Sequence, residues 1–181
     1  MTKGKAKILK SMAVYEGRVF GVRRDEVLEP GGVRTRREVV THPGSVVLLP
    51  VLDDGRVVLV RQYRHAARQY LWELVAGRME PGETPKRAAA RELLEETGYR
   101  AKRYSVFLDM FPTPGFVEER MFVLLAEGLT PGKARPEDDE KIEARAYSVN
   151  ELKQMMQKGR LRDAKSLAGI LYYMNFLRKR R

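Results

Sequence analysis

Two continuous apolar segments, joined by a turn sequence, limit the possible folds of this chain more than any other feature. The segments are residues 45–52 and 56–63, and Asp53-Asp54-Gly55 between them is typical of a β-hairpin turn. A strand that is apolar on both faces must be covered on both faces. The sequence therefore predicts a central sheet that lies between two other layers.

Further strand and helix signals follow these two segments. Four more strands are predicted, at residues 71–75, 104–110, 120–126 and 142–147. Two helices come last: one opens with the capping box 148–151 and ends at Gly159, and the other covers residues 164–178. With the helix described below, this order predicts an α/β fold of the α/β/α sandwich type.

The N-terminal part has extended segments at residues 18–28 and 33–41, joined by the turn sequence 29–32. It is short and only partly apolar, so we expect that it does not fold alone. The expected division is residues 1–41 as a β-rich extension and residues 42–181 as the main domain.

The net charge of +11 is concentrated at the two ends of the chain. Eight of the positive charges belong to Lys3, Lys5, Lys7, Lys10, Arg178, Lys179, Arg180 and Arg181, which leaves +3 for the body. We expect these ends to be solvated tails, without a specific nucleic-acid partner. The sequence contains no long apolar run, no signal-peptide pattern and no Cys, so we expect a cytoplasmic protein without a membrane partner.

Residues 77–99 contain the main chemical signal. A Gly/Pro-rich loop leads to Thr84, a good N-cap, and Pro85 suits the first helical turn. Gly98 is placed to end the helix in a left-handed conformation. The segment therefore predicts a loop followed by a helix of about four turns.

Three carboxylates, those of Glu92, Glu95 and Glu96, fall within about one 5.4 Å turn of this helix. The opposite side, which we expect to be buried, consists of Ala89, Ala90, Leu93 and Leu94. Acids this close repel one another unless cations neutralise them. Hard oxygen donors without Cys favour Mg²⁺ or Mn²⁺. The alternative is a solvated acidic face with ion pairs to Arg87 and Arg91.

The spacing of residues 77–99 resembles the Nudix box: Gly, five residues, Glu, seven residues, Arg-Glu, an aliphatic, any residue, Glu-Glu, any residue, Gly, and an apolar residue, with Tyr99 last. This resemblance implies a Nudix-type sandwich with a mixed sheet and hydrolysis of a nucleoside diphosphate linked to another moiety. It also implies an ion pair between Glu83 and Arg91. The metal ligands it implies are Glu92 and Glu96, with help from Glu95 and the Ala76 carbonyl.

Other segments resemble the ADP-ribose pyrophosphatase subgroup. They are residues 72–77, 112–120, 36–38 and 161–166, together with Arg64 and Pro114, which lies sixteen residues after Gly98. The resemblance implies that Arg37 and Arg64 contact the diphosphate and terminal ribose, and that Glu38 and Glu119 hold ribose or adenine. Arg78 is a further candidate for substrate binding. Guanidinium groups suit phosphate oxygens, and carboxylates accept from ribose hydroxyls.

The acidic loop at residues 137–140 is the expected source of the group that orients or deprotonates water. The sequence departs from the subgroup here: Asp138, one methylene shorter, stands where that group often has a catalytic Glu, and Glu140 stands where it has a further acid that contacts metal. Glu137 replaces Asp138 if the loop is shifted by one residue, and Glu95 is the next candidate for the base. Solvation of the loop is the alternative.

The resemblance therefore implies Mg²⁺-dependent hydrolysis of ADP-ribose to AMP and ribose 5-phosphate by a homodimer. The nearest alternative is a nucleotide-sugar hydrolase that acts on GDP-mannose or an ADP-sugar. A non-catalytic ADP-ribose sensor and an enzyme that processes RNA ends are the alternatives from other classes.

Overall fold

The computed structural model describes residues 4–135 and 141–178. The chain forms two compact units. The first contains Met1–Gly44 and Phe111–Arg120, and the second contains Ser45–Met110 and Met121–Arg181. The first unit therefore combines the N-terminal segment with a ten-residue excursion from the middle of the chain.

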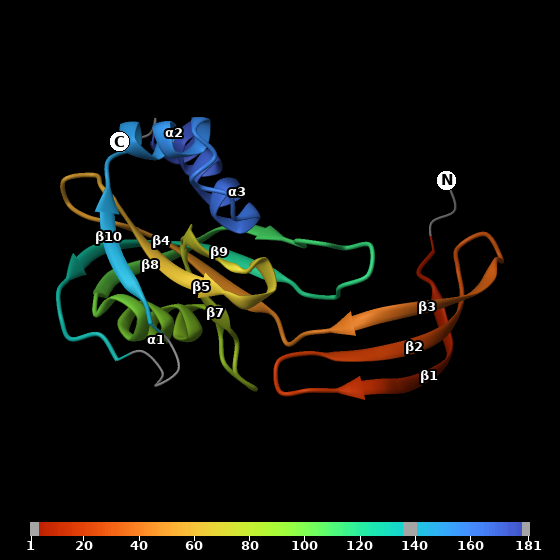
Figure 1. Cartoon of the computed structure of the whole chain (residues 1–181). Coiled ribbons are helices and arrows are strands. Elements are labelled where there is room, and N and C mark those ends of the chain that lie inside the picture. The colour runs from red at the N-terminus through yellow and green to blue at the C-terminus, as the bar shows by residue number, and fades with distance from the viewer. Residues whose placement is uncertain (1–3, 136–140, 179–181) are drawn as a thin grey trace. The chain divides into compact units, whose positions relative to one another are not determined.

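The first unit is a three-stranded antiparallel sheet in the order β1-β2-β3 (Figure 1). Its strands are β1 (Lys7–Glu16), β2 (Gly21–Leu28) and β3 (Arg34–Thr41). The two predicted strands are confirmed as β2 and β3. The interpretation of Lys7 and Lys10 as part of a solvated tail is wrong, because both lie in β1. β1 contains apolar residues, among them Ile8, Met12 and Val14, but Lys7 and Lys10 interrupt them and every side chain of the strand is exposed.

The excursion 111–120 is attached to the edge of this sheet through backbone hydrogen bonds. The Val40 amide donates to the Phe116 carbonyl at 2.8 Å, and the Glu118 amide donates to the Val40 carbonyl at 3.1 Å. Arg23 of β2 also forms an ion pair with Glu118 at 2.5 Å. The excursion therefore extends β3 on its free side.

The second unit is built on a seven-stranded sheet. Its strands are β4 (Ser45–Val51), β5 (Val57–Arg64), β6 (Gln69–Glu73), β7 (Val75–Arg78), β8 (Arg100–Met110), β9 (Met121–Thr130) and β10 (Glu143–Tyr147). The main order is β10-β5-β4-β9-β8, while β6 pairs with β5 and β7 pairs with β4. The sheet is mixed, because β4 runs parallel to β9 and every other pair is antiparallel.

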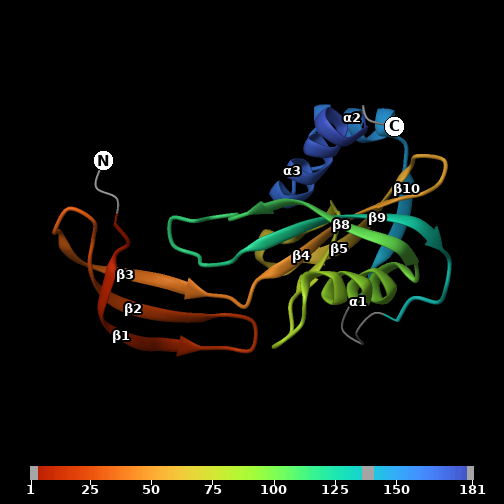
Figure 2. The same ribbon diagram turned by 180° about the vertical axis from the view of Figure 1, so that it is seen from behind.

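Helices cover both faces of this sheet, as Figures 1 and 2 show from opposite sides. The helix α1 (Pro85–Thr97) lies on one face, and α2 (Val149–Gln157) and α3 (Ala164–Tyr172) lie on the other. Val46 and Leu48 of β4 contribute to the core on the α1 side, whereas Val47 and Leu49 contribute to the core on the α2–α3 side. All four are fully buried. The predicted sandwich is therefore confirmed.

Three local predictions need correction in detail. The turn at residues 53–55 forms, but only Val51 and Val57 pair across it before β4 and β5 separate. The predicted strand 71–75 is divided at Leu74, where the chain changes its partner from β5 to β4. The last helix ends at Tyr172 and continues as a π-helical turn, η2 (Tyr173–Leu177). No helix within the described ranges is long and apolar enough to span a bilayer.

Candidate active site

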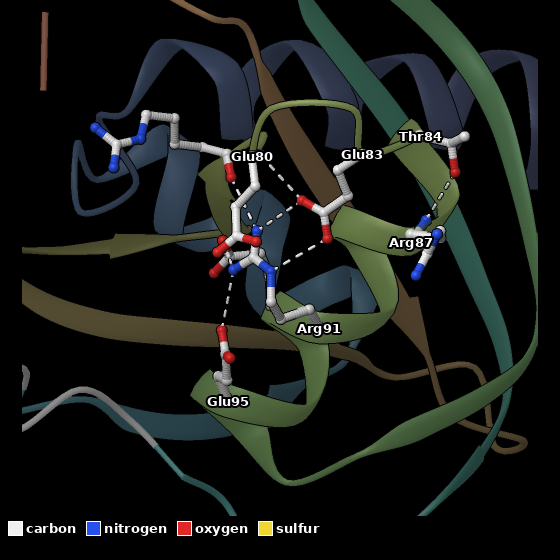
Figure 3. A network of polar contacts seen from close by, with 8 residues as sticks. Glu80, Glu83, Thr84, Arg87, Arg91 and Glu95 are labelled. Carbon is white, nitrogen blue, oxygen red and sulfur yellow. Dashed lines mark hydrogen bonds and ion pairs between the residues drawn. The ribbon is translucent and has the colours of Figure 1, made fainter.

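The acidic helix begins and ends where its capping residues predict. Thr84 accepts a hydrogen bond from the Arg87 amide at 3.4 Å (Figure 3), and Pro85 occupies the first turn. Gly98 has a φ of 75°, and its amide donates to the Leu94 carbonyl. A Cβ at Gly98 would lie 2.7 Å from the Ala134 nitrogen. Glycine is thus required both by the left-handed conformation and by the close approach of the chain leaving β9.

Arg91 lies at the centre of a polar network on this helix (Figure 3). Its Nε and Nη2 donate to the two carboxylate oxygens of Glu83 at 3.2 and 3.0 Å, which is the predicted ion pair. Its Nη1 donates to Glu92 at 2.6 Å and to Glu95 at 3.2 Å, and Nη2 also reaches the Arg78 carbonyl at 2.9 Å. One guanidinium therefore bonds three carboxylates and attaches the helix to the end of β7.

The network also shifts the acid–base properties of its members. The hydrogen bond from Arg91 holds the pKa of Glu83 below its ordinary value. Burial opposes the charge on Arg91, but the hydrogen bonds and charges of Glu83 and Glu92 outweigh it, so the pKa of Arg91 is raised. Both groups are consequently charged throughout the physiological range of pH.

Glu92 and Glu96 lie on the buried side of α1, only 9% and 7% exposed. The prediction that the acids lie opposite the buried side is therefore wrong for these two residues, while Glu95 remains half-buried. The reason lies in β7, where a Cβ on Gly77 would overlap the Glu92 carboxyl group. Glycine at this position leaves space for a buried carboxylate directly against the strand.

This donor set fits a hard divalent cation in its chemistry. It consists of carboxylate oxygens beside the backbone of Ala76 and Gly77, and oxygen is the donor that such cations prefer. Because Gly77 has no side chain, the Glu92 carboxylate can lie directly against β7. Within residues 4–135 and 141–178, no three acidic or His side chains already form a metal-binding group. Arg91 bonds two of the predicted ligands instead. The ligand set of Glu92, Glu95, Glu96 and Ala76 stays a prediction.

Arg64, at the end of β5, forms a two-pronged ion pair with Glu73 of β6. Its Nε and Nη2 each lie 2.8 Å from one carboxylate oxygen. This hydrogen bonding raises the pKa of Arg64 against the effect of burial, and the charges of Glu73, Glu96 and Asp163 act in the same direction. The role of Arg64 in substrate binding stays a prediction.

Sequence reasoning did not identify Glu73 or its other partner, Lys165 of α3. Glu73 is 1% exposed, and Lys165 Nζ lies 2.5 Å from its Oε2. The signal was present in the sequence, since Glu73 is the only charged residue of the apolar segment 71–75. A charged residue in a buried strand requires a partner of opposite charge.

The remaining substrate-binding candidates lie mainly in the first unit. Arg37 and Glu38 are adjacent in β3, so their side chains project from opposite faces of that sheet. Arg37 bonds Glu29 at 2.6 Å, and Glu38 bonds Arg24 at 3.2 Å. Pro114 and Glu119 belong to the excursion 111–120, and Glu119 lies 3.6 Å from His42. Arg78, in the second unit, is exposed at the end of β7.

The acidic-loop candidates, Asp138, Glu140 and Glu137, lie outside the described residues. The chain that enters this loop is held at the acidic helix, because the Arg135 amide donates to the Glu95 carbonyl at 3.0 Å. On the far side of the loop, Ile142 packs against the core cluster that contains Leu93. Both flanks of the loop are therefore held close to α1.

The chain is similar to known proteins along most of its length. The NUDIX domain model matches residues 41–169. An ADP-ribose pyrophosphatase of Bacillus subtilis is 33% identical over 168 residues, 92% of this chain and 91% of that protein. An ADP-ribose pyrophosphatase of Mycobacterium tuberculosis is 37% identical over 167 residues, 90% of this chain and 80% of that protein.

A crystal structure of an ADP compounds hydrolase has the same fold, with a TM-score of 0.84 at 23% identity. The similarity covers 98% of this chain and 96% of that one, so the mixed sheet, its helices and the N-terminal sheet all belong to the shared architecture. The predicted Nudix fold is confirmed. Because the domain match covers most of the chain and the relatives align along nearly its whole length, this protein is a member of the Nudix hydrolase family.

Proposed function

We propose that this Nudix hydrolase cleaves ADP-ribose to AMP and ribose 5-phosphate with Mg²⁺ as cofactor. The observation that carries the proposal is the pair of buried carboxylates on α1, Glu92 and Glu96, of which Glu92 lies against Gly77. The choice of ADP-ribose rests on two relatives named as ADP-ribose pyrophosphatases, at 33% and 37% identity. A purely binding module has no need of an acidic cluster of this kind.

In the proposed reaction, one water adds to a phosphorus of the diphosphate and the bond to the bridging oxygen breaks. Glu92, Glu95, Glu96 and the Ala76 carbonyl would hold Mg²⁺, with Mn²⁺ as a substitute. When bound, the ion neutralises phosphate oxygens and lowers the pKa of a coordinated water. Arg64 would hold the diphosphate through its guanidinium.

The water requires a residue that orients it or accepts its proton. We assign this role to Asp138, and a metal-contacting role to Glu140, because the flanks of their loop are held at α1 through Glu95 and near Leu93. Glu95 itself is the alternative base, since it is half-buried on the same helix.

We also propose a homodimer in which residues 1–41 form the extension that contacts the partner and the substrate. The support is the large number of exposed apolar side chains on the first unit. They include Ile8, Met12, Val14, Tyr15, Val19 and Phe20, each at least 44% exposed. Where such side chains form a continuous patch, they usually mark an interaction site. Arg37, Glu38, Pro114, Glu119 and, from the second unit, Arg78 are the remaining candidates for substrate contact.

Deletion of residues 1–40 tests the dimer. The truncated protein should sediment as a monomer and should turn over ADP-ribose poorly, because Arg37 and Glu38 are removed. A fully active monomer would refute the proposed extension.

Product analysis tests the activity. The full-length protein should be incubated with Mg²⁺ and, separately, with ADP-ribose, GDP-mannose, ADP-glucose and a capped RNA. We expect AMP and ribose 5-phosphate from ADP-ribose at the highest kcat/KM, and the loss of most of this turnover in Glu96→Gln. Preferred cleavage of a sugar nucleotide would support the nearest alternative. Tight binding of ADP-ribose without products would support a sensor.

A further inference from the structure

Glu73 is a buried carboxylate with two cationic partners that come from different parts of the second unit. Arg64 of β5 occupies both of its oxygens, each at 2.8 Å. Lys165 of α3 donates to Oε2 at 2.5 Å. Burial would raise the pKa of Glu73, but the hydrogen bonds from Arg64 and the charge of Lys165 outweigh it and lower the pKa. Glu73 is therefore held as an anion inside the fold.

Lys165 also bonds a second carboxylate, that of Asp163, at 2.9 Å. Asp163 is the N-cap of α3 and accepts from the Ser166 amide at 3.0 Å and the Ser166 hydroxyl at 2.5 Å. The Ser166 Oγ in turn accepts from the Leu74 amide at 2.7 Å. These bonds attach the start of α3 to Leu74, the residue between β6 and β7. The strand β7 then leads into the Nudix box.

The geometry of the Arg64–Glu73 pair leaves part of the guanidinium available. Arg has five N–H donors, and the bonds to Glu73 use one on Nε and one on Nη2. The donors on Nη1 have no hydrogen-bond acceptor among those found in the described part of the chain. The side chain of Arg64 is 40% exposed, whereas that of Lys165 is 13% exposed. Arg64 can therefore reach a ligand, but Lys165 is committed to the two carboxylates.

We propose that Lys165 is a positioning residue, which keeps Glu73 in the orientation that presents the Nη1 edge of Arg64 to the diphosphate of the substrate. This inference rests on the proposed function, because that function assigns Arg64 to the substrate. Lys165 separates the Glu73 and Asp163 carboxylates, which both bond its Nζ. Without that ammonium, the two acids repel each other directly in a buried place. The Glu73 carboxylate then rotates or takes up a proton, and its bidentate ion pair with Arg64 is lost.

A double-mutant cycle with Lys165→Met and Arg64→Ala separates positioning from general stability. We expect Lys165→Met to raise KM about tenfold, the lower end of what loss of a charge-assisted hydrogen bond produces, and to change kcat less. In the Arg64→Ala background, the same substitution should change kcat/KM less than twofold, since its effect passes through Arg64. Lys165→Arg keeps the positive charge and should bring KM most of the way back to the wild-type value. Lys158→Met, at an exposed lysine that follows α2, should have the kinetics of the wild type.

A second measurement does not depend on catalysis. In ¹H–¹⁵N NMR spectra, the Arg64 Nε–H should exchange slowly in the wild type and faster, with a shifted resonance, in Lys165→Met. The Arg91 Nε–H, which is bonded to Glu83, should be unchanged and serves as an internal control. If the wild type cleaves no nucleotide, the proposed function fails and this spectrum alone decides the positioning role. An unchanged Arg64 resonance, or equal effects of Lys165→Met in both backgrounds of the cycle, would overturn the inference.

Discussion

Replacement of Arg91 by Met is the sharpest perturbation of the site, because one guanidinium bonds Glu83, Glu92 and Glu95. Removal of one partner of a buried ion pair costs about 3–5 kcal/mol. The Arg91 side chain is 26% exposed, so solvent screens part of the loss, and we expect the lower end, about 3 kcal/mol. For a chain of this size, each kcal/mol lowers Tm by about 2–4 °C. Without metal, Tm should therefore fall by about 6–12 °C.

Magnesium should stabilise this variant more than the wild type. In the wild type, Arg91 Nη1 already bonds carboxylate oxygens of Glu92 and Glu95, the groups that we assign to the ion. In Arg91→Met, these carboxylates repel one another until a cation binds, so added Mg²⁺ should raise Tm by several degrees more than in the wild type. Arg87→Met, on an exposed position of the same helix, is the matched control and should show neither effect.

Differential scanning calorimetry in EDTA and across a Mg²⁺ titration measures both effects. A Tm within about 2 °C of wild type in EDTA would show that the network contributes little to stability. An equal increase of Tm with Mg²⁺ in both proteins would refute the idea that Arg91 and the ion share ligands.

Three further predictions concern neighbouring groups. Glu96→Gln should remove most turnover, a larger loss than the ~10–100-fold that is typical when a hydrogen-bond partner of a metal ligand is changed. Its Tm without metal should stay equal or rise. Turnover near that of the wild type would contradict the assignment of Glu96 as a metal ligand. Gly77→Ala should lower the free energy of unfolding by about 1–3 kcal/mol, because the added Cβ overlaps the Glu92 carboxyl group. It should also raise the Mg²⁺ concentration required for half-maximal activity. An unchanged Mg²⁺ requirement would show that Glu92 is not a ligand. The pKa of Glu73 is lowered from an ordinary value of 4.5, so its ionised form stabilises the fold above pH 4.5. This contribution is lost as the pH falls through the lowered pKa. In urea unfolding between pH 6 and 3, the free energy of unfolding should therefore fall less steeply in Glu73→Gln than in the wild type.

The amino-acid sequence alone determined the features that depend on local chemistry. Thr84 and Gly98 fix the ends of the acidic helix because a hydroxyl N-cap and a left-handed glycine act within one turn of chain. The two-sided apolar runs determined a sheet covered on both faces, because such strands have no face that tolerates water. The resemblance to the Nudix box implied the ion pair between Glu83, in the loop before α1, and Arg91 on the helix, and the structure contains it.

Only the tertiary structure decided features that depend on partners distant in the sequence. The burial of Glu92 depends on Gly77 in another element, and helical spacing by itself placed that acid on the wrong side. The strand β1 exists through its pairing with β2, although all of its side chains are exposed. The bond between Glu73 and Lys165 joins residues 92 positions apart. A local sequence pattern shows which face of a segment is apolar. The partner of a buried charge can come from a distant part of the chain, so only the tertiary structure identifies it.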